Sequence, residues 1–115
     1  MKVAVIGSRG FDDYDLMVKT LDKIKITLIV SGHAVGADKL GERYAIEKGI
    51  ETKIFLPDWK NLGKAAGMIR NTDIINEAEL VVAFWDGTSK GSADSIEKAN
   101  KLNKPVIIVD YEKNV

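Results

Sequence analysis

The stretch Leu28–Asp38, which reads LIVSGHAVGAD, decides the fold class of this chain. Its first three residues form an apolar run that is too short for a helix and rich in branched side chains, as in a strand buried on both faces. A turn of small residues follows, and Ala37, Leu40 and Tyr44 then recur at the spacing of an amphipathic helix. Gly49 is suited to end this helix. The stretch therefore predicts a strand, a glycine-rich turn and a helix in direct succession.

The same order of strand and helix recurs on both sides of this stretch. Further apolar runs that predict strands lie at Val3–Ile6, Lys53–Leu56, Leu80–Trp85 and Val106–Val109. Helical spacing of apolar side chains is found between them, at Met17, Leu21 and Ile24, at Ala66, Ile69, Ile75 and Ala78, and at Ile96, Ala99 and Leu102. This alternation predicts a three-layer α/β fold, in which helices cover both faces of a five-stranded parallel sheet. We expect one domain over residues 1–115, with 111–115 as a loose tail.

The order of the strands in the sheet bears on where a ligand would bind. Five-stranded parallel sheets of this kind usually run in the order 3-2-1-4-5 or 2-1-3-4-5. The third run, Lys53–Leu56, begins with a polar residue, which suits the edge of a sheet and favours the first order. In that order the chain reverses direction between the first and the fourth strand. Ligands bind at such a point, outside the carboxyl ends of the strands.

The composition excludes several classes of function. Of the 115 residues, 45% are hydrophobic and 30% are charged, and 17 Lys and Arg balance 17 Asp and Glu. This zero net charge argues against a protein that coats nucleic acid or an anionic membrane. Because the chain has no Cys and a single His, we expect no disulfide, no metal and no cofactor. No apolar run has the length of a signal peptide or a membrane span, which predicts a cytoplasmic protein.

Small-residue turns follow three of the predicted strands, at Gly7–Gly10, Ser31–Asp38 and Asp86–Asp94. We expect them to open on one rim of the sheet. Glycine lets the backbone approach a ligand, and the N-terminus of the next helix offers unpaired N–H donors, so the turns predict a phosphate site. The simpler explanation is that short turns need Gly and Ser for conformation and capping. Neither the dinucleotide fingerprint nor the P-loop motif is present, which argues against hydride transfer and P-loop hydrolysis.

Charged side chains near these turns are the next candidates. Arg9 follows the first strand directly, and Arg70 lies in the third helix, where its guanidinium either clamps a phosphate or lies in solvent. His33 is either an acid–base group of the site or a polar loop residue. Asp86 either contacts a ribose hydroxyl or starts a turn. Asp38 and Asp94 both lie early in helices, where the helix dipole favours a carboxylate without any function.

Four motifs together resemble a known family: Gly7–Arg9 (GSR), Ser31–Asp38 (SGHAVGAD), Ala66–Asn71 (AGMIRN) and Trp85–Ser92 (WDGTSKGS). They are similar to the SLOG superfamily, and within it to the YspA, cpYpsA-related branch. The superfamily also contains the LOG phosphoribohydrolases and the DprA/Smf proteins. The resemblance implies a Rossmann-like sheet and a site for a nucleotide or nucleotide-derived ligand, such as a nucleoside monophosphate, ADP-ribose or an NAD-related molecule.

The resemblance also implies which residues bind. With the neighbours that the turns supply, the expected ligand-binding residues are Gly7, Ser8, Arg9, Gly32, His33, Gly36, Asp38, Arg70, Asn71, Asp86, Gly87, Ser89, Gly91 and Ser92. The LOG enzymes carry a catalytic glutamate after their last glycine-rich loop, and Ser95 stands at that position here. Asp94 is one residue earlier, a rotation of about 100° around a helix. Asp94 and Asp38 are therefore the candidates for a catalytic carboxylate.

Three functions remain open. The first is binding or sensing of a nucleotide-derived small molecule, which needs no catalytic acid. The second is hydrolysis of an N-glycosidic bond in a nucleotide derivative. The third is single-stranded DNA binding of the DprA kind, which the zero net charge makes the weakest reading. We also expect a homodimer, because Trp59, Met68, Ile74 and Trp85 are more large side chains than we expect one small core to bury completely.

Overall fold

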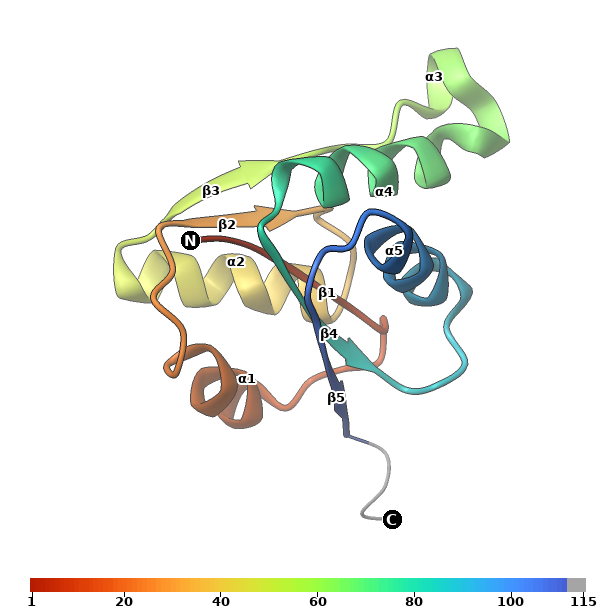
Figure 1. Ribbon diagram of the computed structural model, residues 1–115. Helices are drawn as coiled ribbons and strands as arrows, with labels where there is room; N and C mark the ends of the chain where they lie inside the picture. Colours follow the sequence, from red (N-terminus) through yellow and green to blue (C-terminus); the bar gives the residue numbers. More distant parts are fainter. Residues whose placement is uncertain (112–115) are drawn as a thin grey trace.

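Strands and helices alternate along the chain in the computed structural model, which describes residues 1–111 (Figure 1). The elements are β1 (Lys2–Gly7), α1 (Tyr14–Leu21), β2 (Leu28–Ser31), α2 (Ala37–Lys48), β3 (Glu51–Ile54), α3 (Trp59–Leu62), the 3-10 turn η1 (Gly63–Ala65), α4 (Ala66–Glu77), β4 (Leu80–Trp85), α5 (Lys90–Lys101) and β5 (Val106–Asp110). The expected α/β fold is confirmed. None of the helices within residues 1–111 has the length and apolar character to cross a membrane.

The five strands are parallel and lie in the order β3-β2-β1-β4-β5, which confirms the expected order. In the registers of the sheet, Ala4 of β1 faces Val30 of β2, and Gly7 faces Phe84 of β4. The chain therefore reverses direction between β1 and β4. The turns after these two strands leave the sheet side by side.

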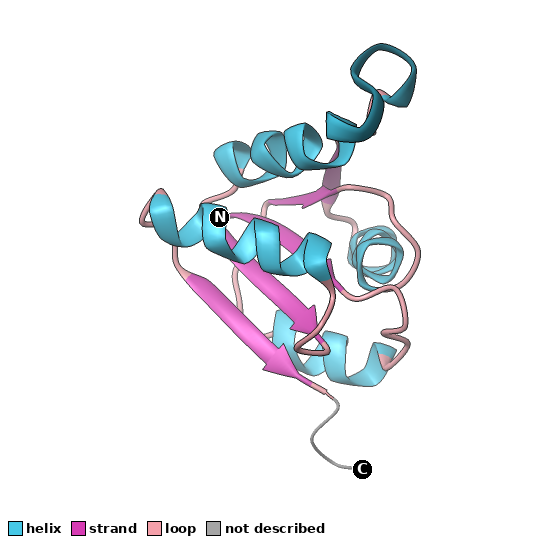
Figure 2. Cartoon of the chain, turned by 90° about the vertical axis from the view of Figure 1, so that its right-hand side faces the viewer, coloured by secondary structure: helices cyan, strands magenta, loops and turns pink. Residues whose placement is uncertain are grey.

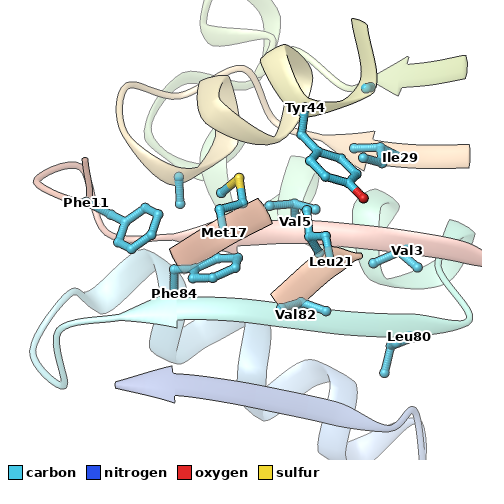
Figure 3. Close-up of a cluster of buried hydrophobic side chains, with 12 residues drawn as sticks. Val3, Val5, Phe11, Met17, Leu21, Ile29, Tyr44, Leu80, Val82 and Phe84 are labelled. Carbon is cyan, nitrogen blue, oxygen red and sulfur yellow. The ribbon is translucent and has the colours of Figure 1, made fainter. Parts of the chain in front are cut away.

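One face of the sheet packs against α1 and α2. Val3 and Val5 point to this face and meet Met17 of α1 and Tyr44 of α2, together with Phe11 from the turn after β1 (Figure 3). The rings of Phe11 and Phe84 stack with centroids 4.7 Å apart, and Tyr111 meets Phe11 edge-on at 4.8 Å. Tyr111 is therefore packed, although we expected it in the loose tail. Residues 112–115 of that expected tail lie outside the described residues.

The other face packs against α4 and α5, which completes the three layers (Figure 1). Ala4 and Ile6 alternate with the residues of the first face and meet Ile74 and Ile75 of α4 and Ile96 of α5. Because β1 and β4 are covered on both faces, they read as continuous apolar runs rather than as alternating ones. The site described below lies where these two central strands end.

Two elements differ from their predicted bounds. The edge strand β3 runs over Glu51–Ile54, two residues earlier than expected, and all four of its side chains are exposed. The third helix, expected over about residues 62–78, begins only at Ala66, because a separate short helix precedes it: Asp58 caps α3 by accepting from the Asn61 N–H at 3.2 Å, and Gly63, with φ of 57°, ends it. The α3 segment thus stands away from the sheet, beyond the start of α4 (Figure 2).

Three apolar residues lie elsewhere than the helical spacing predicted. Ile69 and Leu102 were expected on buried helix faces and are exposed; Leu102 lies just beyond the end of α5 at Lys101. Ile74 was expected at an oligomer interface, and it is instead buried in the core beside α5.

Candidate functional site

A cavity of about 430 Å³ opens at the carboxyl ends of β1 and β4, where the strand order predicted a crevice. It is lined by the turns after β1, β2 and β4 and by the sides of α4 and α5 that face them. The lining residues are Ile6, Gly7, Arg9, Gly10, Ala34, Asp38, Arg70, Asn71, Ile74, Asp86, Ser89, Lys90, Gly91, Ser92 and Ser95. Within residues 1–111, no three acidic or His side chains gather in a way that could hold a metal ion.

Ser8 joins the turns after β1 and β4. Its backbone N–H donates to the Phe84 carbonyl at 2.9 Å, and its hydroxyl accepts from the Asp86 N–H at 2.9 Å. The Asp86 carboxylate in turn accepts from the N–H groups of Thr88 and Ser89, both at 2.8 Å. These N–H donors hold the pKa of Asp86 far below its usual range. Ser8 is buried and holds the β1 and β4 turns together. Asp86 stabilises the β4 turn and also lines the cavity.

Arg70 reaches from α4 to the turn after β2. Its Nη1 donates to the Gly32 carbonyl at 2.7 Å, and its Nε donates to Asn71 Oδ1 at 3.1 Å. A Cβ on Gly32 would lie 2.7 Å from Arg70 Nη1 and 2.9 Å from Asp38 Oδ2. Gly32 is therefore glycine because the guanidinium and the carboxylate come so near its backbone. Arg70 is a positioned cation of the cavity and not a solvated helix side chain.

Asp38 is the buried carboxyl of the cavity. Burial raises its pKa to about 6, and an N–H bond from Ala34 at 3.3 Å and the charge of Arg70 limit that rise. The group therefore exchanges its proton close to neutral pH, in a cavity that also holds Arg70. A carboxyl of this kind can act as a proton donor or acceptor toward a ligand.

Asp94 belongs to a different network. Its Oδ2 accepts from Lys98 Nζ at 2.7 Å and from Asn71 Nδ2 at 3.1 Å, and Lys98 also donates to the Met68 carbonyl at 2.8 Å. These contacts tie α5 to α4. Asp94 does not line the cavity, whereas Ser95 does, as the rotation of one residue around the helix predicted. The two candidate carboxylates are thus separated: Asp38 faces the cavity and Asp94 clamps the helices.

The glycines of the three turns fall into two groups. A Cβ on Gly7 would collide with the Phe84 carbonyl and lie 2.6 Å from Ala37 Cβ, and a Cβ on Gly36 would collide with the Ser8 carbonyl. Gly36 also has φ of 93°, a conformation that favours glycine. A Cβ on Gly87 or Gly91 would meet nothing within 4 Å. The first group is required by packing, whereas Gly91 borders open space in the cavity.

Two serines of α5 face the cavity without a partner. Ser92 is 6% exposed and Ser95 is 3% exposed, and neither hydroxyl makes a hydrogen bond within residues 1–111. No side-chain oxygen or nitrogen of the described residues is both sealed from solvent and unpaired. The two hydroxyls are therefore still accessible, and the space that they border is the cavity. Buried hydroxyls normally find a partner, so this arrangement favours an occupant that supplies one.

The structure brings most of the predicted binding residues together. Those that line the cavity are Gly7, Arg9, Asp38, Arg70, Asn71, Asp86, Ser89, Gly91 and Ser92. Those that do not are Ser8, Gly32, His33, Gly36, Gly87 and Asp94. His33 turns to α2 instead: it has φ of 61°, and its Nδ1 lies 2.8 Å from Glu42 Oε1. Glu42 also accepts from the Ser31 hydroxyl at 2.8 Å, so this group organises the turn after β2.

Some lining residues were not found from the sequence. They are Ile6, Gly10, Ala34, Ile74, Lys90 and Ser95. Ser95 had a usable signal, because it follows Ser92 and Gly91 by three and four positions in a helix and therefore shares their face. Ile6 and Ile74 had none, since their apolar side chains read as core residues, and both also contribute to the core.

Comparison with known proteins identifies the family. The family model of the YspA, cpYpsA-related SLOG proteins matches residues 1–62. The chain belongs to this SLOG family. The match covers the turns after β1 and β2, so the family resemblance seen in the sequence is confirmed. The motifs around Arg70 and Gly91 lie beyond the matched residues.

A phage protein and a bacterial protein are similar to this SLOG chain. Gene 61 protein of Mycobacterium phage D29 is 31% identical over an alignment of 117 positions, which spans 92% of this chain and 94% of that protein. The crystal structure of the DNA processing protein A (DprA) from Streptococcus pneumoniae matches with a TM-score of 0.72 and 22% identity over 93% of this chain. The chain covers 49% of the DprA chain, about half of its length. At this identity, the likeness shows the Rossmann-like fold.

Proposed function

We propose that this chain binds a nucleotide or a nucleotide-derived small molecule, with a phosphate in the cavity between the β1 turn, the β4 turn and the start of α5. The observation that carries the proposal is that the hydroxyls of Ser92 and Ser95, beside Gly91, make no hydrogen bond within residues 1–111. The first turn of α5 offers backbone N–H donors at the same place, and a helix N-terminus favours an anion. Open space, free donors and a positive helix end together suit a phosphate.

The cations of the cavity support an anionic ligand. Arg70 is held in place by the Gly32 carbonyl, so its guanidinium is oriented before a ligand arrives. Arg9 and Lys90 are exposed on the rim, and neither makes a hydrogen bond or an ion pair through its side chain within residues 1–111. Charge-assisted hydrogen bonds from such groups are about twice as strong as neutral ones. Binding through fixed cations and hydroxyls requires no metal.

Hydrolysis of an N-glycosidic bond is the second candidate, because Asp38 is a cavity carboxyl with a pKa of about 6. As a carboxylate it would accept a proton from water while the water oxygen bonds to the sugar carbon. The bond from that carbon to the base nitrogen would break, and the nitrogen would take up a proton as it leaves. Asp94 is a poorer choice for this role, since Lys98 and Asn71 already occupy its carboxylate.

Ligand-dependent stability tests the binding proposal. The melting temperature is measured with AMP, ADP-ribose, NAD and single-stranded DNA, where a ligand at about a hundred times its Kd adds about 2.7 kcal/mol to the free energy of unfolding. We expect stabilisation by a nucleotide and none by DNA. Chromatography of the same mixtures detects released base, which distinguishes hydrolysis from binding. Stabilisation by DNA alone would contradict the proposal and support a DprA-like function.

Arg9→Gln makes that test specific to the site, because the Arg9 side chain makes no hydrogen bond or ion pair within residues 1–111 that the substitution would remove. We expect about tenfold weaker nucleotide binding at unchanged stability, from the loss of one charge-assisted interaction. Lys25→Gln is the matched control, since Lys25 is exposed at the other end of the sheet and the substitution removes the same charge. Equal affinity of Arg9→Gln and the control would place the phosphate elsewhere.

We also propose that the chain forms a homodimer through the α3 segment. Leu56, Trp59, Leu62, Met68 and Ile69 are large apolar side chains that are exposed on and beside this segment, and Trp59 is 59% exposed. Exposed apolar surface of this kind marks an interface. Trp85 does not belong to it, because its indole N–H donates to the Ser89 carbonyl at 3.1 Å. Sedimentation of the wild type and of Trp59→Ser at micromolar concentration tests the proposal, and a monomeric wild type would contradict it.

A further inference from the structure

A second hollow lies next to the cavity and shares the residues Arg9 and Gly10 with it. This groove has a volume of about 480 Å³ and runs between the β1 turn and the exposed side of α2. It is lined by Arg9, Gly10, Phe11, Asp12, Val35, Gly36, Lys39, Leu40 and Arg43. The Arg9–Gly10 turn therefore forms a ridge with a hollow on each side. Nothing in the proposed phosphate site uses the groove.

The groove is positively charged. Arg9, Lys39 and Arg43 line it, against the carboxylate of Asp12 in the lining and that of Glu47, which pairs with Arg43 from outside the lining. Neither Arg9 nor Lys39 makes a hydrogen bond or an ion pair through its side chain within residues 1–111. The chain as a whole carries no net charge, so this local excess of cations is a property of the groove. An anionic occupant would neutralise it.

Arg43 is oriented by its neighbours rather than free. Its Nε donates to Glu47 Oε2 at 3.2 Å, and its guanidinium lies 3.9 Å above the ring centre of Tyr14. The Tyr14 hydroxyl donates to Glu47 Oε1 at 2.7 Å, and burial together with this bond raises the pKa of Tyr14 to about 12, so the donor keeps its proton. The terminal nitrogens of Arg43 make no hydrogen bond within the described residues. A guanidinium fixed in this way is prepared to bind a phosphate.

The groove also has an apolar part. Val35 is 63% exposed, although it lies in a turn next to the buried residues Ala37 and Asp38. Leu40 adds a partly buried apolar surface, and the polar groups lie around these two side chains. Ligand sites are commonly apolar surfaces with a few placed polar groups. A sugar or a base beside a phosphate matches this combination.

We propose that the groove binds the second half of a pyrophosphate-linked nucleotide, an inference that rests on the proposed function. In this arrangement Arg9 lies between the two phosphates, and Lys39 and Arg43 are the specificity residues. One phosphate lies at the start of α5 and the other on the groove side of the ridge. A nucleoside monophosphate fills only the cavity and leaves Lys39 and the terminal nitrogens of Arg43 without a phosphate. The chain thereby prefers the two-part ligand.

Calorimetric titration with AMP and with ADP-ribose tests the preference, because ADP-ribose adds one phosphate and one ribose to AMP. We expect ADP-ribose to bind the wild type about tenfold more tightly than AMP, or better. The double variant Lys39→Gln/Arg43→Gln should lose this advantage and keep the AMP affinity within about twofold. Lys23→Gln/Lys25→Gln is the control, since it removes two positive charges from exposed positions outside both hollows and should keep the advantage.

The outcomes separate this inference from the proposed function. If AMP binds and ADP-ribose keeps its advantage in the Lys39→Gln/Arg43→Gln variant, the groove is not used and the inference is wrong while the proposed function stands. Loss of AMP binding in that variant would also overturn it, because the two residues would then act on the cavity. If neither nucleotide binds the wild type, the proposed function fails, and the inference fails with it.

Discussion

The turns after β2 and β4 look alike in the sequence and differ in the structure. Both are rich in Gly and Ser and both lead into a helix. In the β2 turn, Gly32 and Gly36 are enclosed, one by Arg70 and Asp38 and the other by the backbone of the β1 turn. In the β4 turn, Gly87 and Gly91 face open space.

This difference shows that glycine occurs in a strand-to-helix turn for two separate structural reasons. In the β2 turn, a side chain at Gly36 would collide with the backbone of the β1 turn, and one at Gly32 would meet the side chains of Arg70 and Asp38. Gly91 has no such neighbour, and its lack of a side chain leaves the cavity open above the hydroxyls of Ser92 and Ser95. The carboxylates follow the same division: burial raises the pKa of Asp38 in the β2 turn, while N–H donors lower that of Asp86 in the β4 turn.

Substitution of the packed glycines should have the largest effect on stability. In Gly36→Ala, the new methyl group meets two backbone carbonyls that cannot move independently, at a φ of 93°. We expect the free energy of unfolding to fall by about 3 kcal/mol or more. Gly91→Ala is the matched control, and its stability should be unchanged or raised by up to about 1 kcal/mol. Denaturant unfolding measures the difference in stability between the two variants. Equal midpoints would contradict the statement that Gly36 is required by packing and Gly91 is not.

The buried charge of Asp38 should appear in the pH dependence of stability. Because its pKa is raised in the folded state, the protonated form is stabilised by folding, and this contribution is complete below about pH 4 and is lost as the pH rises through about 6. A rise of roughly two pKa units corresponds to about 3 kcal/mol. In Asp38→Asn this dependence should be absent.

Unfolding free energies of wild type and Asp38→Asn at about pH 4 and pH 7 provide the measurement. The difference between the two proteins should change between these pH values, with the wild type losing stability relative to the variant as pH rises. A difference that stays constant would mean that Asp38 titrates normally and is not the buried carboxyl of the cavity.

The clamp between α4 and α5 should have a smaller effect. Lys98→Met removes a largely buried ion pair with Asp94 and the bond to the Met68 carbonyl, and we expect a loss of about 1 kcal/mol with unchanged nucleotide affinity. Lys101→Met is the control on the same helix, because its ion pair with Glu97 at 3.1 Å is exposed. Denaturant midpoints and titrations of both variants are compared. Loss of nucleotide binding in Lys98→Met would show that Asp94 belongs to the site.

The fold was largely predictable from the sequence, because short apolar runs and helical spacing depend on burial by two layers of helices. The polar start of the third run correctly placed β3 at an edge. The short helix α3, ahead of the third predicted helix, was missed, since Asp58 and Gly63 act through a cap and a positive φ that periodicity does not record. Periodicity also does not record the contact at Gly67, where a Cβ on the glycine would lie 3.5 Å from the Trp59 ring.

The candidate site was predictable as a set of turns but not as a set of roles. The strand order implied that three turns share one rim, and the cavity lies there. Which turn glycine is packed depends on contacts between residues far apart in sequence, such as Gly32 with Arg70. The choice between Asp38 and Asp94 depended on the ion pair of Asp94 with Lys98, whose spacing of four residues on a helix is a sequence signal that the prediction did not use.

Nucleotide affinity in a series of Gly91 variants with larger side chains tests whether a phosphate binds at the start of α5. Gly91→Ala, Gly91→Val and Gly91→Leu add side chains of increasing size at a position where a Cβ meets nothing within 4 Å, so the fold should remain intact in all three. We predict that the affinity for AMP falls stepwise with size and is lost by Gly91→Val or Gly91→Leu, while circular dichroism and the melting temperature stay close to those of the wild type. Unchanged AMP affinity in the folded Gly91→Leu protein would contradict a phosphate site at the start of α5.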